Sequence, residues 1–120
     1  MLPKRIRDFL NRGDVVVADI VESPTTRCFV RIRPVVNPAV PREEQRAVNS
    51  PLSMWEYWWY DFRRMKLRSG WEELENDYDL FLTSDESALT RSEAEFYVVL
   101  WKWVPPTTEL RHISESACPE

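Results

Sequence analysis

The 120-residue chain is poor in glycine, cysteine and histidine, and each shortage excludes a class of site. Its two glycines, Gly13 and Gly70, stand far apart, so no glycine-rich phosphate-binding loop is present. The single histidine, His112, and the two cysteines, Cys28 and Cys118, form no short ligand pair such as C-x-x-C. We therefore expect no metal, no cofactor and two free thiols.

Long apolar runs are also missing, and the basic N-terminal stretch is not followed by an apolar one. The sequence therefore predicts a cytoplasmic protein without a membrane partner. Apolar residues make up 43% of the chain, including six Trp and five Phe, which is enough for one core. We expect a compact domain over residues 1–104, with a proline-rich loop at 34–49. Residues 105–120 then form a tail that could add an edge strand.

Hydrophobic spacing in the first third of the chain predicts a short helix and a β-hairpin. Apolar residues at helical spacing precede Gly13, which ends the helix. Two β-branched runs, 14–22 and 27–35, flank the turn sequence Ser-Pro-Thr-Thr and predict a four-residue loop. In that register Asp19 interrupts the core-facing side, which otherwise holds Val15, Val17, Val21, Cys28, Val30 and Ile32.

The remaining elements are predicted to be two helices and a strand. Five apolar residues at helical spacing indicate an aromatic-rich helix over 51–68. The capping-box pattern Ser69-x-x-Glu72 indicates a second, acidic helix over 70–82. The dense apolar run favours a buried strand over 95–104, and a helix beginning with Thr90-x-x-Glu93 is the alternative. The expected fold class is α+β, with a small antiparallel sheet packed on helices.

Charge is divided unevenly along the chain, and the acidic part suggests a binding surface. Residues 1–68 carry a net charge of +5 and residues 69–100 a net charge of −8, within a total of −4. A solvent-exposed acidic patch would steer a basic partner toward the protein. Its candidate residues are Glu72, Glu73, Glu75, Asp77, Asp79, Asp85 and Glu86.

Aromatic and basic residues extend this candidate surface. On a helix over 51–68, Tyr57, Tyr60 and Arg64 fall opposite the apolar stripe, and Tyr and Arg are enriched at protein interfaces. With no catalytic motif in the sequence, we expect a non-catalytic protein-binding module. Its charge and size suit an acidic inhibitor or immunity-type protein that binds and blocks a basic protein partner.

Two other functions stay open. Arg27, Phe29, Arg31 and Arg33 alternate along one predicted strand, which resembles in residue type the basic, aromatic sheet surfaces that bind nucleic acid. The same acidic residues could instead supply a carboxylate pair to a small enzyme, because hard cations and acid–base catalysis both use clustered carboxylates. The sequence leaves the oligomeric state open.

Overall fold

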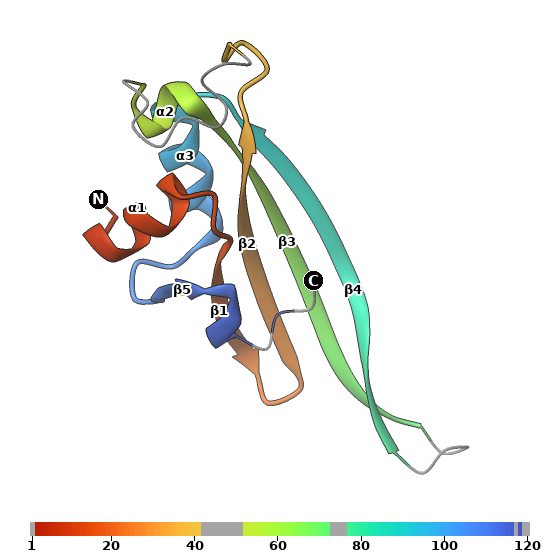
Figure 1. Ribbon diagram of the computed structural model, residues 1–120. Coiled ribbons are helices and arrows are strands. Elements are labelled where there is room, and N and C mark those ends of the chain that lie inside the picture. The colour runs from red at the N-terminus through yellow and green to blue at the C-terminus, as the bar shows by residue number, and fades with distance from the viewer. Residues whose placement is uncertain (1, 42–51, 73–76, 117, 119–120) are drawn as a thin grey trace.

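The protein is an elongated α+β domain in which helices cover one face of an antiparallel sheet (Figure 1). The computed structural model describes residues 2–41, 52–72, 77–116 and 118, without the side chains of 69–81. Along the chain the elements are α1 (Lys4–Asn11), β1 (Val16–Ser23), β2 (Thr26–Val36), α2 (Met54–Tyr57), β3 (Trp58–Glu72), β4 (Asp77–Thr90), α3 (Glu93–Trp103), β5 (Leu110–His112) and the 3-10 helix η1 (Ile113–Glu115).

The five strands lie in the order β4-β3-β2-β1-β5, and every neighbouring pair is antiparallel. β1 to β4 are neighbours in the sheet in their chain order, although the connection from β2 to β3 spans residues 37–57 and includes α2. α3 then carries the chain back across the sheet, and β5 adds to the free edge of β1. The expected fold class is confirmed, and the segment after Pro105 contributes an edge strand.

The predicted register of the first hairpin was wrong by one residue on β1. The strands are joined by a two-residue turn, since Ser23 pairs with Thr26, and a bulge lies between Val21 and Ser23. Ile20 therefore pairs with Cys28, and Asp19 pairs with Phe29. A one-residue shift moves every side chain of a strand to the other face. Asp19 thus lies on the face away from the helices, where Arg27 donates hydrogen bonds to its carboxylate.

The aromatic helix predicted over 51–68 was also wrong. One helical turn forms at α2, where the side chain of Ser53 accepts a hydrogen bond from the Glu56 N–H. From Trp58 onward the chain is strand β3. A run so dense in Trp, Tyr and Phe matches a period of two as well as one of 3.6, and aromatic residues favour strands.

Two further predictions were wrong in the type of element. The described part of 70–82, predicted as an acidic helix, is strand, and 95–104, predicted as a strand, is mostly helix. Residues up to Glu72 belong to β3 and residues from Asp77 belong to β4, so a strand hairpin replaces the helix. Residues 95–104 lie mostly in α3, whose N-cap Ser92 accepts a hydrogen bond from the Glu95 N–H at 3.2 Å. The alternative prediction of a helix in this segment was therefore correct. Its predicted start was not, because Thr90 is a buried residue of β4 and the helix begins after Ser92.

The main core fills the space between the sheet and the two longer helices. α1 contributes Ile6 and Leu10, α3 contributes Phe96 and Leu100, and alternate residues of β1, β2 and β3 face them. The aromatic rings of this core meet edge to face around Phe96. Burial of these side chains is the main stabilising term of the fold.

Candidate functional site

The most distinctive backbone feature is the far end of the β3–β4 hairpin. β2 begins at Thr26, which pairs with Arg68, so no described strand lies beside β3 on that side beyond Arg68. β3 and β4 nevertheless stay paired as far as Glu72 and Asp77. We call residues 69–72 and 77–80 the distal ribbon. In Figure 1 this ribbon extends past the ends of the other strands, and the molecule measures 56 × 28 × 22 Å.

The distal ribbon holds three of the seven predicted acidic residues and no basic one. Glu72 pairs in register with Asp77, and Asp79 pairs with Gly70. Trp71 and Tyr78 hold opposite positions between these two pairs. Glu73 and Glu75 lie outside the described residues. The register thus places Glu72, Asp77 and Asp79 on one face of a section of sheet that is two strands wide, and Trp71 and Tyr78 on the other face.

Two other predicted acidic residues lie in the body of the sheet and are ion-paired. Asp85 accepts hydrogen bonds from Arg63 Nε at 2.9 Å and Arg63 Nη2 at 2.7 Å. Glu86 accepts one from Arg64 Nη2 at 2.6 Å. Adjacent strands place each carboxylate beside a guanidinium, which cancels its charge locally. We therefore leave Asp85 and Glu86 out of the proposed binding surface.

The Asp85–Arg63 pair should be visible in a titration. Hydrogen bonds from Arg63 hold the pKa of Asp85 below its ordinary value of 3.8. We expect Arg63→Gln to raise the pKa of Asp85 toward that value, because the neutral amide no longer favours the ionised carboxylate. The measurement is a pH titration of the side-chain carboxyl carbon by NMR. Arg33→Gln is the control, since Arg33 pairs with Asp61 and should leave the pKa of Asp85 unchanged.

The lowered pKa of Asp85 also decides how pH changes the stability of the fold. A carboxyl group with a lowered pKa in the folded state stabilises the fold at pH above its unfolded pKa. That contribution is lost as pH falls through the lower, folded pKa of Asp85. The same pKa for Asp85 in the wild type and in Arg63→Gln would show that the ion pair does not form in solution.

The tyrosine and arginine surface predicted from the sequence does not exist in the expected form. Tyr60 is 1% exposed and lies in the main core, where burial raises the pKa of its phenol. Arg64 lies on the helix-covered face, with its guanidinium 5.0 Å from the ring centroid of Trp103. Tyr57 belongs to α2 and is half-buried. The prediction was wrong because it assumed a helix where β3 forms.

The four predicted nucleic-acid-binding residues do share one face of β2, the face away from the helices. Phe29, however, is 2% exposed and packs in a second cluster with Val17, Met65, Leu67 and Cys118. Arg27 is ion-paired with Asp19, and Arg33 is ion-paired with Asp61. Of the three arginines, Arg31 alone forms no ion pair among the described residues, and its charge helps Arg63 to lower the pKa of Asp85. A buried aromatic ring and two neutralised arginines weaken the case for base stacking and phosphate binding.

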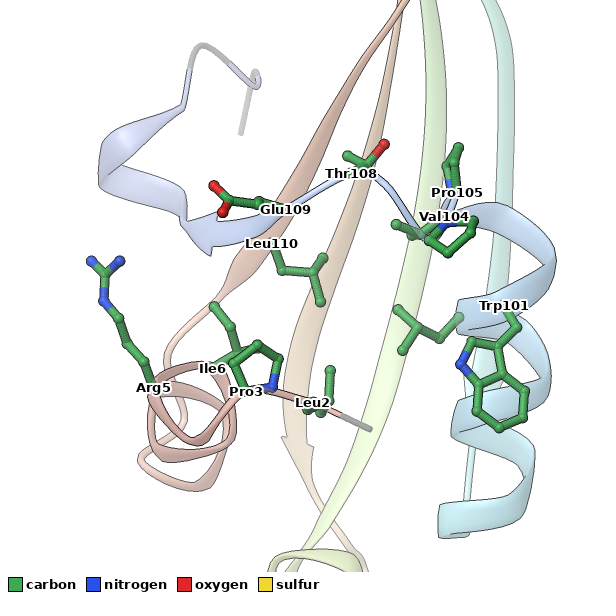
Figure 2. A pocket seen from close by; sticks show the side chains of 12 residues that line it. Leu2, Pro3, Arg5, Ile6, Trp101, Val104, Pro105, Thr108, Glu109 and Leu110 are labelled. Carbon is green, nitrogen blue, oxygen red and sulfur yellow. The ribbon is translucent and has the colours of Figure 1, made fainter.

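A cavity of about 520 Å³ lies on the other side of the sheet, between α1 and α3 (Figure 2). Apolar side chains line most of it, with Leu2 and Ile6 from the N-terminal region facing Val104 and Leu110. Arg5 stands at its edge and is held by Glu115, with 2.6 Å between Nη2 and Oε1. Sequence patterns do not predict this cavity, because it forms only where segments far apart in the chain meet.

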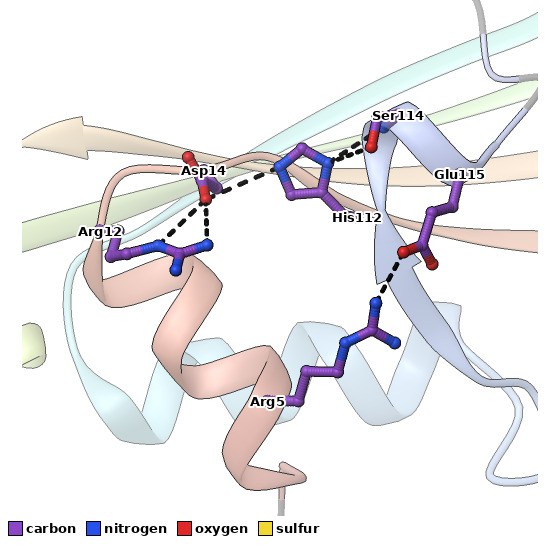
Figure 3. Close-up of polar contacts among 6 residues, drawn as sticks. All are labelled: Arg5, Arg12, Asp14, His112, Ser114 and Glu115. Atoms are coloured by element: carbon purple, nitrogen blue, oxygen red, sulfur yellow. Dashed lines mark hydrogen bonds and ion pairs between the residues drawn. The ribbon is translucent and has the colours of Figure 1, made fainter.

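Polar contacts connect α1 and the loop after it to β5 and η1 (Figure 3). Arg12 Nη2 lies 2.8 Å from Asp14 Oδ2, and His112 Nε2 lies 3.6 Å from the same oxygen. His112 Nδ1 lies 2.8 Å from the hydroxyl oxygen of Ser114 and also accepts the Ser114 N–H. These contacts hold the last strand against α1. They give His112 a structural role.

The described residues show neither a metal-binding cluster nor a thiol–imidazole pair of Cys28 and His112. No group of three or more His, Cys, Asp or Glu residues is placed to hold a metal ion within the described part of the chain. In the sheet, Val16 of β1 pairs with His112 of β5 on one side and with Ile32 of β2 on the other. Cys28 lies four residues before Ile32 along β2. That separation is about 13 Å along the strand, too far for a thiol and its base. Burial also raises the pKa of the Cys28 thiol.

None of the helices in the described ranges is long and apolar enough to cross a membrane. Comparison with protein-family models, with curated proteins and with solved structures finds no match for this chain. Its function is therefore inferred from its own residues.

Proposed function

We propose that the protein is a non-catalytic binding module of the inhibitor or immunity type, and that the distal ribbon binds a basic protein partner. The observation that carries this proposal is the register of β3 and β4 beyond Arg68. It brings Glu72, Asp77 and Asp79 together on a two-stranded section that no other described strand covers.

The composition of the distal ribbon suits a protein partner. Its described residues carry three acidic groups and no Lys or Arg, in contrast to the body of the sheet, where arginines neutralise Asp85 and Glu86. Negative potential at the end of an elongated molecule steers association with a basic partner. Trp71 and Tyr78 hold the register position between the acidic residues and so belong to the other face of the ribbon, which leaves the acidic residues alone to carry the proposal.

The test compares two neutralised variants on a surface of immobilised poly-L-lysine, used as a basic probe. The ribbon variant combines Glu72→Gln, Asp77→Asn and Asp79→Asn. At low salt we expect it to associate about tenfold more slowly than the wild type, with a weaker salt dependence, because electrostatic steering contributes about 10- to 1,000-fold to association rates.

A matched control removes the same number of negative charges from the body of the protein. It combines Asp8→Asn, Glu93→Gln and Glu109→Gln, all of which replace exposed residues. Its association rate should stay within about twofold of the wild type, since these charges lie outside the distal ribbon. Equal slowing in both variants would mean that net charge alone drives binding, and the proposal would then be abandoned.

A further inference from the structure

α3 is apolar on both of its sides, which is unusual for a helix at a protein surface. Its inner side carries Phe96, Leu100 and Trp103 into the core. Its outer side carries Val98 and Trp101, which are 64% and 68% exposed. A helix that is apolar all round is normally buried.

The exposed apolar residues form one continuous stripe. Ala94, Val98 and Trp101 follow one another at spacings of four and three residues, the spacing of a helix–helix seam, and the exposed Pro105 lies just beyond the end of α3. Tyr97 borders the stripe, with its ring 5.3 Å from that of Trp101. We call these residues, Ala94, Tyr97, Val98, Trp101 and Pro105, the α3 stripe. Trp101 also borders the cavity between α1 and α3 (Figure 2).

Charges beside the α3 stripe indicate what covers it. Glu95 and Lys102 are seven residues apart, so they lie two turns apart on the same side of the stripe, and both residues are exposed. When two identical helices pack antiparallel, the two-fold axis between them reverses the direction of the second helix. It also leaves the side that carries Glu95 and Lys102 next to the same side of the other helix. Glu95 of one copy then meets Lys102 of the other, and the same contact occurs twice.

We propose that the α3 stripe is the interface of a homodimer, in which two copies of α3 pack antiparallel around Val98. The apolar stripe supplies the contact area, and the two Glu95–Lys102 contacts select an antiparallel second copy. A parallel pair would separate these opposite charges. α3 has 11 residues and is about 16 Å long, so the interface is small and the dimer forms at micromolar or higher concentration.

The first test is sedimentation equilibrium of the full chain from about 1 μM to about 1 mM, the range in which weak complexes dissociate. The wild type should shift from the mass of one chain to the mass of two. Val98→Glu should raise the dimer Kd about tenfold or more, because two like charges meet at the two-fold axis. Val21→Glu is the matched control: Val21 is 68% exposed on the opposite face of the sheet, and its variant should dimerise as the wild type does.

The second test uses charge reversal to fix the orientation of the helices. Glu95→Lys and Lys102→Glu should each raise the dimer Kd about threefold to thirtyfold, because an attractive contact becomes repulsive at two symmetric places. The double variant restores both contacts and should return to within about twofold of the wild-type Kd.

Three results would overturn the dimer: a wild type that stays monomeric throughout the concentration range, a dimer insensitive to Val98→Glu, or a double variant as weak as the single ones. The α3 stripe is independent of the distal ribbon. The Val98→Glu variant can therefore be tested on poly-L-lysine as a monomer, which separates a failure of the dimer from a failure of the proposed function.

Discussion

Replacing Phe96 by alanine is expected to lower the free energy of unfolding by about 3–5 kcal/mol, a large part of the stability of a small domain. The Phe96 ring is fully buried, and its centroid lies 5.1 Å from the rings of Trp55 and Phe62 and 5.3 Å from that of Tyr60. Alanine would remove these edge-to-face contacts and leave a cavity between α3 and β3. Urea denaturation followed by tryptophan fluorescence measures the change.

The control for Phe96→Ala is Val98→Ala, which alters the same helix on its exposed side. It should change the free energy of unfolding by about 0.5 kcal/mol or less, because the side chain is 64% exposed. Both measurements belong at low protein concentration, where the proposed dimer is dissociated. Equal losses in the two variants would contradict the position of Phe96 at the centre of the core.

Gly13→Ala is expected to cost about 2–3 kcal/mol, although the residue lies in a loop outside the core. The φ angle of Gly13 is +88°, a conformation that costs a residue with a Cβ atom about 1–2 kcal/mol. A Cβ atom there would lie 3.1 Å from Cη2 and 3.3 Å from Cζ2 of the Trp58 indole. The indole cannot move away freely, because its Nε1–H donates a hydrogen bond to the Asn11 carbonyl oxygen at 3.0 Å.

A double-mutant cycle separates the two causes of this loss. In a Trp58→Phe background the obstructing part of the ring is gone, so Gly13→Ala should cost only the backbone term of about 1–2 kcal/mol. Thermal and urea unfolding of the four proteins give the coupling energy. The same cost in both backgrounds would show that Trp58 does not pack over Gly13.

The two proposed binding surfaces have different origins in the chain. The distal ribbon depends on an acidic sequence that is paired beyond the reach of β2, and the α3 stripe depends on a helix with more apolar surface than the core can cover. A dimer through α3 carries two distal ribbons. It would therefore bind a partner with repeated basic sites more tightly than one chain does, through effective concentration alone.

Part of the candidate site was predictable from the residues and part was not. The acidic run and its position in the chain are properties of the sequence. The pairing of Asp85 with Arg63 and of Glu86 with Arg64 was not predictable. The partners in each pair are 22 residues apart in the chain and meet only when β3 and β4 align. The apolar stripe of α3 was hidden for a related reason, since residues 96–101 are apolar throughout and suit either a buried strand or a helix.

By itself, the sequence determined the α+β class, the first helix, the two strands of the first hairpin and the uneven distribution of charge. These features depend on local composition, on turn residues and on the spacing of apolar residues. Only the tertiary structure decided that the aromatic segment is a strand, which residues of β1 face the core, and which acidic residues have arginine partners. Those outcomes depend on strand register and on contacts between distant segments, and a linear pattern does not contain that information.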